Sequence, residues 1–232
     1  MYRGLSYQLL QNLPLFGELE ESEQKEIWNH VITRSYTKSN IILFEEDQGD
    51  SLFIIKKGKV KITRLSEEGK EVILSILGEG EFFGEMSLLD GESRSANVIA
   101  LSDCEVFILK RDNFLSIIKS TPQIAITLLE ELAGRIRKSD QQIEYLSLAD
   151  AENRVAMTIL RIAEESGTFK MGKVTIEELP MQQDMANMSG TSRETISRML
   201  SEFADKGYIE RKGKKLVLLD YEKFKTDFSK RL

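Results

Sequence analysis

The residues best suited to binding chemistry lie between positions 83 and 96. One carboxylate, Glu85, precedes one guanidinium, Arg94, by nine residues, with Gly84 beside the carboxylate and Gly91 between the two. A guanidinium presents a planar fork of donors that suits a phosphate, whereas a carboxylate only accepts and therefore suits a sugar hydroxyl. A small molecule that carries both a phosphate and a ribose would satisfy both groups. The alternative is an Arg–Glu ion pair on the surface of a sheet.

The same stretch closely resembles the phosphate-binding cassette of cyclic-nucleotide-binding domains, which reads F-G-E-x-x-L-L and then R-S/T-A. The resemblance implies a short helix between Glu85 and Arg94, whose N-terminal amides would add to an anion site. It assigns Glu85 to a ribose hydroxyl, and Arg94 with Ser95 to the cyclic phosphate. Gly84 allows the backbone to turn and to approach the ligand closely.

Short apolar runs separated by turn residues predict the sheets that position this cassette. Residues 60–65 alternate with period two, as a half-buried strand does, and glycine-containing turns such as 56–59 separate the runs. Many short strands with regular turns are typical of an antiparallel barrel or jelly roll. The other predicted strands are 41–44, 52–55, 72–77, 96–100 and 106–109.

A long helix is predicted from Thr121 to about Leu148, because Thr121 and Pro122 supply an N-cap and a first-turn proline. Apolar residues then recur at alternating spacings of four and three, a heptad pattern that indicates pairing with a second helix and hence a homodimer. A helix that packs only on its own sheet usually has a wider apolar face. The predicted dimer seam consists of Ala125, Leu129, Leu132, Ile136, Ile143 and Leu146.

Ser139 is the polar member of this seam, and Asp140 follows it. In the catabolite-activator branch of the family that the cassette resembles, two adjacent hydroxyl residues here hydrogen-bond the nucleotide base, one of them from the partner subunit. Ser139 keeps a hydroxyl, whereas Asp140 departs from the pattern. An aspartate accepts from an exocyclic amine such as that of adenine but cannot donate to a ring nitrogen. Cyclic AMP therefore fits as the regulatory ligand, and another small ligand, or none, is the alternative.

Residues 179–200 predict a helix-turn-helix, with Ala186 at the close helix contact, a turn at Gly190, and a second helix capped by Thr191 or Ser192. The outward face of the second helix carries Arg193, Glu194, Ser197 and Arg198. Arginine reads O6 and N7 of guanine and glutamate accepts from N4 of cytosine, so this face can enter a major groove. A solvated charged face is the alternative.

The sequence G-x-S-R-E-T-x-S-R in this helix resembles the recognition helix of CRP/FNR transcription regulators. The resemblance implies a homodimer that binds a palindrome in double-stranded DNA, with TGTGA-like half-sites. A basic segment at 211–215 between two apolar runs predicts a wing hairpin suited to phosphates. Met181 departs from the family, which usually has Thr or Ser there to cap the first helix and contact a phosphate.

The chain is therefore interpreted as an α+β protein with a jelly-roll sensor domain (1–120), a dimerisation helix and hinge (121–149), and a winged helix-turn-helix domain (150–232). The family resemblance implies that ligand binding reorients the DNA-binding domains about a hinge near Asp150. The acidic loop 67–71 resembles one that the activator branch uses to contact RNA polymerase, which makes the polymerase a candidate partner; a solvated turn is the alternative.

Composition limits the other classes of function. The net charge is −6, but residues 150–232 carry 15 Lys and Arg against 14 Asp and Glu, so the acidic excess lies in the rest of the chain. No apolar run is long enough to span a membrane and no signal peptide is evident, so a cytoplasmic location is expected. A single cysteine, Cys104, and a single histidine, His30, supply no set for haem, an iron–sulfur cluster or catalysis. We expect no enzyme activity, no metal and no cofactor.

Overall fold

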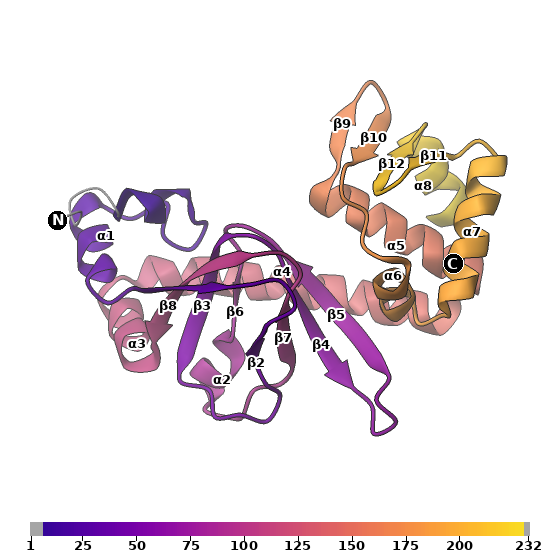
Figure 1. Cartoon of the computed structure of the whole chain (residues 1–232). Coiled ribbons are helices and arrows are strands. Elements are labelled where there is room, and N and C mark those ends of the chain that lie inside the picture. The colour runs from indigo at the N-terminus through magenta and orange to yellow at the C-terminus, as the bar shows by residue number, and fades with distance from the viewer. Residues whose placement is uncertain (1–6, 230–232) are drawn as a thin grey trace. The chain divides into compact units, whose positions relative to one another are not determined.

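A computed structural model of the chain describes residues 7–229. Its backbone contacts divide the chain into two compact units, Met1–Arg135 and Ile136–Leu232. The long helix α4 (Pro122–Leu148) contributes to both units (Figure 1). Each unit is described by itself.

The first unit is a β-roll of antiparallel strands with helices at its start and end. One of its sheets has the strand order β1-β8-β3-β6 and another has the order β2-β7-β4-β5. Its elements in chain order are the 3₁₀ helix η1 (Tyr7–Asn12), α1 (Glu21–Trp28), β1 (Ile32–Tyr36), β2 (Ile41–Leu43), β3 (Ser51–Lys57), β4 (Val60–Leu65), β5 (Glu71–Leu77), β6 (Phe82–Phe83), α2 (Glu85–Asp90), β7 (Asn97–Ala100), β8 (Cys104–Lys110), α3 (Arg111–Ser120) and the first half of α4.

The predicted jelly roll is confirmed, and each predicted apolar run contains a strand. The sequence did not predict β1, whose residues are almost all exposed, or β6, which is two residues long. Neither strand has enough alternating residues to give a periodic signal. Pairing places both of them: β1 aligns with β8 and β6 with β3.

The core of the first unit explains why α4 begins where it does. One buried cluster joins the N-terminal helices, β3, β8 and α3, and it includes Phe16, Phe107 and Phe114. Ile124 and Leu128 of α4 are buried in the same cluster, so the first turns of α4 are fixed to the roll by apolar contact. Another cluster fills the roll itself, where Phe53 and Phe83 stack with ring centroids 5.1 Å apart.

The second unit contains the remainder of α4, several shorter helices and an antiparallel sheet of order β11-β12-β10-β9. Its further elements are α5 (Ala151–Ser166), β9 (Thr168–Lys170), β10 (Lys173–Ile176), α6 (Gln182–Ser189), α7 (Arg193–Asp205), β11 (Ile209–Lys212), β12 (Lys215–Leu218) and α8 (Tyr221–Ser229). Asp150 caps α5, since its carboxylate accepts from the backbone N–H of Asn153 at 2.8 Å.

The C-terminal hairpins differ in detail from the sequence prediction. The strands of the wing continue through Lys212 and resume at Lys215, so the tip is the pair Gly213 and Lys214 rather than all five basic-segment residues. Gly213 has φ of +62°, a left-handed conformation that a two-residue hairpin turn requires. The hairpin β9–β10 and the helix α8 were not predicted. No helix in residues 7–229 is both long and apolar enough to cross a membrane.

Candidate functional site

The cassette forms a tight turn between β6 and a short helix. Gly84 has φ of +81° and is the N-cap of α2, which runs from Glu85 to Asp90 and has Gly91, also at φ +81°, as its C-cap. Residues with a side chain rarely adopt this conformation, so glycine at both ends lets a six-residue helix fit between strands. The helix that the family resemblance implied is present.

Arg94 lies inside the roll with 4% of its surface exposed. Its Nη1 donates to the carbonyl of Gly84 at 2.7 Å and to Oγ of Ser87 at 2.9 Å, and its Nη2 donates to the carbonyl of Ser51 at 2.9 Å. Its Nε has no hydrogen-bond partner among the residues that the structure describes. Neutral groups therefore accept the hydrogen bonds of a buried cation, and its Nε–H is left without an acceptor.

Burial lowers the pKa of the Arg94 guanidinium, and the carboxylates of Asp50, Glu85 and Asp47 act in the opposite direction. Arginine nevertheless stays protonated in proteins, so its buried charge needs compensation. An anion that accepts from the guanidinium would supply both the missing charge and the missing acceptor.

Gly49 and Gly84 let the backbone pass close to this guanidinium. A Cβ at Gly49 would fall 2.2 Å from Oγ of Ser87 and 2.8 Å from Cζ of Arg94. A Cβ at Gly84 would fall 2.7 Å from Nη1 of Arg94. The cassette therefore closes around Arg94 only because both positions lack a side chain.

Glu85 is also buried, with 5% of its surface exposed, and its partner comes from α4. Oε1 of Glu85 accepts from Nη1 of Arg135 at 3.0 Å. Nη2 of Arg135 donates to the carbonyl of Phe82, and the guanidinium lies 4.4 Å from the centre of the Phe82 ring. Arg135 was not identified from the sequence. A basic residue one helical turn before the polar break at Ser139 was the available signal.

The other predicted ligand contacts are exposed. Ser95 directly follows Arg94, and its hydroxyl donates to the sulfur of Met86 at 3.6 Å. Ser139 and Asp140 lie on α4, four and five residues after Arg135, in the second unit. Both residues are exposed to solvent.

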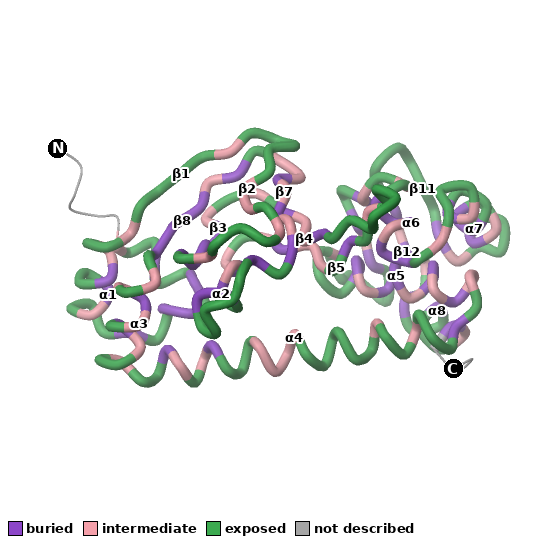
Figure 2. Tube along the Cα trace, turned by 90° about the horizontal axis from the view of Figure 1, so that it is seen from below, coloured by how far each residue is buried: buried purple, intermediate pink, exposed green. Residues whose placement is uncertain are grey.

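The predicted seam residues form an exposed apolar stripe on α4. Leu129 is 65% exposed, and Ile136 and Ile143 are each 62% exposed. Figure 2 shows most of this helix as exposed or intermediate. Leu146 is also exposed, whereas Leu132 is partly buried against the core of the roll and Ala125 is partly buried. Large aliphatic side chains repeated along one helix face are characteristic of a surface that pairs with another helix.

The helix-turn-helix consists of α6, a left-handed turn at Gly190 with φ of +59°, and α7. Ser192 rather than Thr191 caps α7, because its Oγ accepts from the backbone N–H of Thr195 at 3.2 Å. Ala186 is fully buried where the two helices approach, as the sequence predicted. Ile196, Leu200 and Phe203 are buried on the inner face of α7, which fixes the outer face by helical geometry.

Arg193, Glu194, Ser197 and Arg198 are all exposed on that outer face. Backbone N–H at the start of α7 and the Ser192 hydroxyl lower the pKa of Glu194, so this carboxylate remains a hydrogen-bond acceptor at neutral pH. Arg198 approaches Glu202 only at 3.9 Å, the length of a weak surface ion pair. The helix presents charged donors and acceptors that are available to a partner.

Met181 is the N-cap residue of α6, and in the described part of the chain its side chain makes no capping hydrogen bond. The departure from the family pattern therefore leaves the start of α6 without a side-chain cap. His30 is exposed in the turn that follows α1, and Cys104 is buried on β8. In residues 7–229 no three His, Cys, Asp or Glu side chains gather as a metal site would require.

A β-roll with a buried guanidinium and carboxylate, followed by a long helix and a winged helix-turn-helix, defines a ligand-responsive DNA-binding regulator. The cyclic nucleotide-binding domain family matches residues 33–121, and the Crp-like helix-turn-helix domain family matches residues 153–226. The chain belongs to the CRP/FNR family of transcription regulators.

Individual relatives match nearly the whole chain. The chain is 36% identical to the cyclic AMP receptor protein of Thermus thermophilus, over 84% of this chain and 88% of that protein. It is 30% identical to the CRP-like cAMP-activated global transcriptional regulator of Mycobacterium tuberculosis, over 93% and 96% of the two chains. The solved structure of FixK2 from Bradyrhizobium japonicum superimposes with a TM-score of 0.75 at 25% identity, covering 84% of this chain and 96% of that one.

Proposed function

We propose that this regulator is a homodimer activated by cyclic AMP. The observation that carries the proposal is the buried guanidinium of Arg94, which has an unsatisfied Nε, together with the buried carboxylate of Glu85, whose charge acts on that guanidinium. A cyclic phosphate supplies the anion that Arg94 needs, and the ribose hydroxyl of the same molecule supplies a donor for Glu85. The two cyclic AMP-related proteins named above support the choice of ligand.

Each predicted residue has a role in this proposal. Arg94 and the exposed hydroxyl of Ser95 bind the phosphate, and Gly84 lets the backbone come close to the ligand. Glu85 accepts from the ribose hydroxyl. A carboxylate has two oxygens, so Glu85 can accept from Arg135 and from the ribose at the same time.

The base end of the ligand is assigned to Ser139 and Asp140 of α4. Adenine presents an exocyclic amine from which both side chains can accept, whereas the carbonyl of guanine offers no donor to Asp140, so Asp140 favours adenine at that position. Because α4 also carries the apolar stripe of Leu129, Ile136 and Ile143, a ligand that contacts this helix can influence how two copies pair. A tenfold activation needs a difference of only about 1.4 kcal/mol in the ligand's binding to the two states.

The proposed DNA-binding surface consists of the outer face of α7 and the wing hairpin β11–β12. The residues that read base edges are Arg193, Glu194, Ser197 and Arg198. The DNA backbone is contacted by Thr191 and Ser192 at the start of α7, and the basic wing tip binds further phosphates. A symmetric dimer would place two such helices on a palindrome whose half-sites are one turn apart. The sensor, helix and DNA-binding regions are assigned to 1–120, 121–149 and 150–232.

The remaining partners follow from the same proposal. A regulator of this kind works in the cytoplasm, where it can reach DNA. The hairpin tip of β4–β5, with the acidic pair Glu67 and Glu68, is the candidate contact for RNA polymerase. Regulation of this type needs no metal, cofactor or catalytic group.

Calorimetric titration with cyclic AMP, cyclic GMP and cyclic-di-GMP tests the choice of ligand. We expect saturable binding of cyclic AMP that Arg94→Gln weakens by at least about tenfold, since a hydrogen bond to a charged group contributes about 1.5–3 kcal/mol. Arg64→Gln is the matched control, because Arg64 is exposed and pairs with Glu45 at 2.7 Å on the hairpin. The absence of saturable cyclic AMP binding, together with DNA binding by Arg94→Gln equal to wild type, would overturn the proposal.

A further inference from the structure

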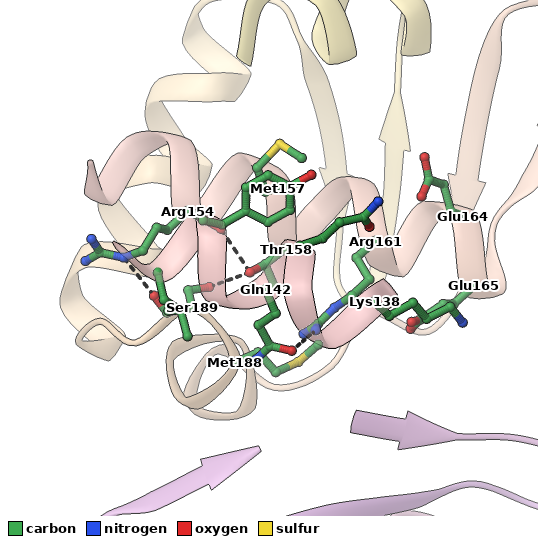
Figure 3. Close-up of a pocket in the computed structure, with 13 residues that line it drawn as sticks. Lys138, Gln142, Arg154, Met157, Thr158, Arg161, Glu164, Glu165, Met188 and Ser189 are labelled. Carbon is green, nitrogen blue, oxygen red and sulfur yellow. Dashed lines mark hydrogen bonds between the residues drawn. The ribbon is translucent and has the colours of Figure 1, made fainter. Parts of the chain in front are cut away.

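A cavity of about 330 Å³ lies inside the second unit, apart from the cassette residues 84–95. Its lining comes from the last turns of α4, from α5 and from the end of α6 (Figure 3). A volume of this size is in the range of small-molecule pockets. The apolar part of the lining is formed mainly by Leu146, Met157 and Met188.

Arg161 supplies a cation to this lining, and the hydrogen-bond partner of its Nη1 is neutral. Nη1 of Arg161 donates to Oε1 of Gln142 at 2.8 Å, a contact that ties α5 to α4 (Figure 3). Burial lowers the pKa of the Arg161 guanidinium, and the charge of Glu165 acts in the opposite direction. Glu165, one turn later on α5 and also in the lining, is an anionic neighbour of Arg161, whereas the hydrogen-bond acceptor Gln142 brings no charge. A charged acceptor on a ligand would make a stronger hydrogen bond to this guanidinium than the amide does.

Two other charged groups of the lining, Glu164 and Arg154, are already engaged. Glu164 accepts from the hydroxyl of Tyr221 at 2.6 Å and from Nζ of Lys225 at 3.0 Å. Arg154 donates from Nε to the carbonyl of Ser189 at 3.0 Å and from Nη1 to the carbonyl of Ala149 at 2.9 Å. Lys138 is exposed to solvent. Arg161 is therefore the cation best placed to select a ligand.

In the wall beside the apolar residues, two buried hydroxyls already have hydrogen-bond partners within the protein. The hydroxyls of Thr158 and Ser189 lie 2.8 Å apart, and Ser189 donates to the carbonyl of Met185 at 2.7 Å. These buried groups leave the methionine side chains as the adaptable part of the cavity, because methionine is unbranched and polarizable. Methionines suit ligands with an aromatic or alkyl body.

We propose that this cavity binds a small amphipathic anion, with its carboxylate, phosphate or sulfonate at Arg161 and its apolar body against Met157 and Met188. The site shares no residue with Gly84, Glu85, Arg94 or Ser95, so it is a second ligand site in addition to that of the proposed function. An occupant binds only the arrangement in which α4, α5 and α6 form the cavity, and it stabilises that arrangement by mass action. α6 is the first helix of the helix-turn-helix, so occupancy acts on the unit that carries α7.

Fluorescence titration of the full-length protein with a matched pair of probes tests the site. The anion 8-anilinonaphthalene-1-sulfonate and the uncharged N-phenyl-1-naphthylamine share an aromatic body and differ in the acidic group. The titrations use the wild type, Arg161→Gln, which removes the cation, and Met157→Trp, which fills the cavity. Arg137→Gln is the control, because Arg137 is an exposed α4 arginine outside the lining. Each titration is repeated with excess cyclic AMP.

We expect saturable binding of the sulfonate that Arg161→Gln weakens by about tenfold or more, with binding of the neutral probe changed less than twofold. Met157→Trp should weaken both probes, and neither Arg137→Gln nor cyclic AMP should affect either one. Equal sulfonate affinity in wild type and Arg161→Gln, or displacement by cyclic AMP, would overturn the proposal. Binding that disappears as protein concentration rises through dimer formation would assign the cavity to a second copy of the chain instead. Phenyl phosphate and phenylacetate, used as competitors, then distinguish a phosphate from a carboxylate ligand.

Discussion

The contact between Glu85 and Arg135 is the residue-scale feature with the clearest energetic consequence. Glu85 is buried, and its carboxylate pairs with the guanidinium that Arg135 supplies from α4. Removing one member of a buried ion pair costs far more than removing both, because the remaining charge is left without compensation. Arg135 is partly exposed, which moderates the effect.

We predict that Arg135→Gln destabilises the first unit by about 1–3 kcal/mol and that the double variant Glu85→Gln with Arg135→Gln recovers much of this loss. The measurement is urea unfolding followed by the fluorescence of Trp28, the one tryptophan of the chain, which packs on the core of the same unit. Additive losses in the two single variants and the double variant would show that the pair is not coupled.

The sequence led to Glu85 and Arg94 but not to Arg135, and the reason is chemical. A phosphate-and-ribose interpretation follows from the types and spacing of residues within one segment. Arg135 lies fifty residues after Glu85, and a basic residue on a helix is ordinarily a solvated one. The packing of Ile124 and Leu128 on the roll places the next turns of α4 against the cassette. This tertiary contact joins segments that are distant in sequence, so the sequence pattern does not reveal it.

At the scale of elements, the helix-turn-helix shows how local chemistry fixes a functional surface. Ser192 caps α7, Gly190 supplies the left-handed turn, and buried residues at 196, 200 and 203 orient the helix. An N-cap serine replaced by alanine typically costs about 1 kcal/mol. The start of α7 also carries Arg193 and Glu194, two of the proposed DNA contacts.

We predict that Ser192→Ala destabilises α7 locally by about 1 kcal/mol, which would speed amide exchange in its first turn by roughly fivefold. Hydrogen exchange of peptides that cover α7 measures this change. Ser197→Ala is the control, because Ser197 lies in the interior of the same helix and its exposed side chain caps nothing in the described structure. Equal protection of α7 in wild type and Ser192→Ala would contradict the assignment of Ser192 as the cap.

The elements that sequence reasoning missed share a lack of pattern. β9 and β10 are three and four residues long, and the exposed residues of β9 give no alternation. They form because β10 pairs with β12 in the sheet of the wing. By contrast, β4 alternates and α4 keeps its spacing over many turns, so both were predicted at nearly their observed bounds. A strongly periodic segment therefore predicts its element correctly, whereas a short edge strand depends on partners distant in sequence.

At the scale of the whole molecule, the apolar stripe of α4 is a regular apolar surface that is exposed in the single described chain. Isoleucine at 136 and 143 and leucine at 129 are all more than 60% exposed, and they recur every seven residues. Burying one such side chain contributes about 1.5–3 kcal/mol, and a symmetric pair of helices buries each of them twice. The proposed palindromic DNA site depends on this pairing, because one recognition helix reads only one half-site.

We predict that Ile136→Glu converts the protein to a monomer at concentrations where the wild type is a dimer, raising the dimer dissociation constant by roughly a hundredfold or more. Two carboxylates would face each other at the seam without partners, in addition to the loss of the apolar contact.

Sedimentation equilibrium measures the dissociation constant, and fluorescence anisotropy compares a two-half-site duplex with a single half-site. Gln141→Glu is the control, since it adds the same carboxylate at an exposed position of α4 outside the seam. The variant should lose the preference for the two-half-site duplex and keep its weak affinity for one half-site, because α7 itself is unchanged. A fully dimeric Ile136→Glu would exclude this face of α4 as the dimer interface and with it the geometry proposed for the palindrome.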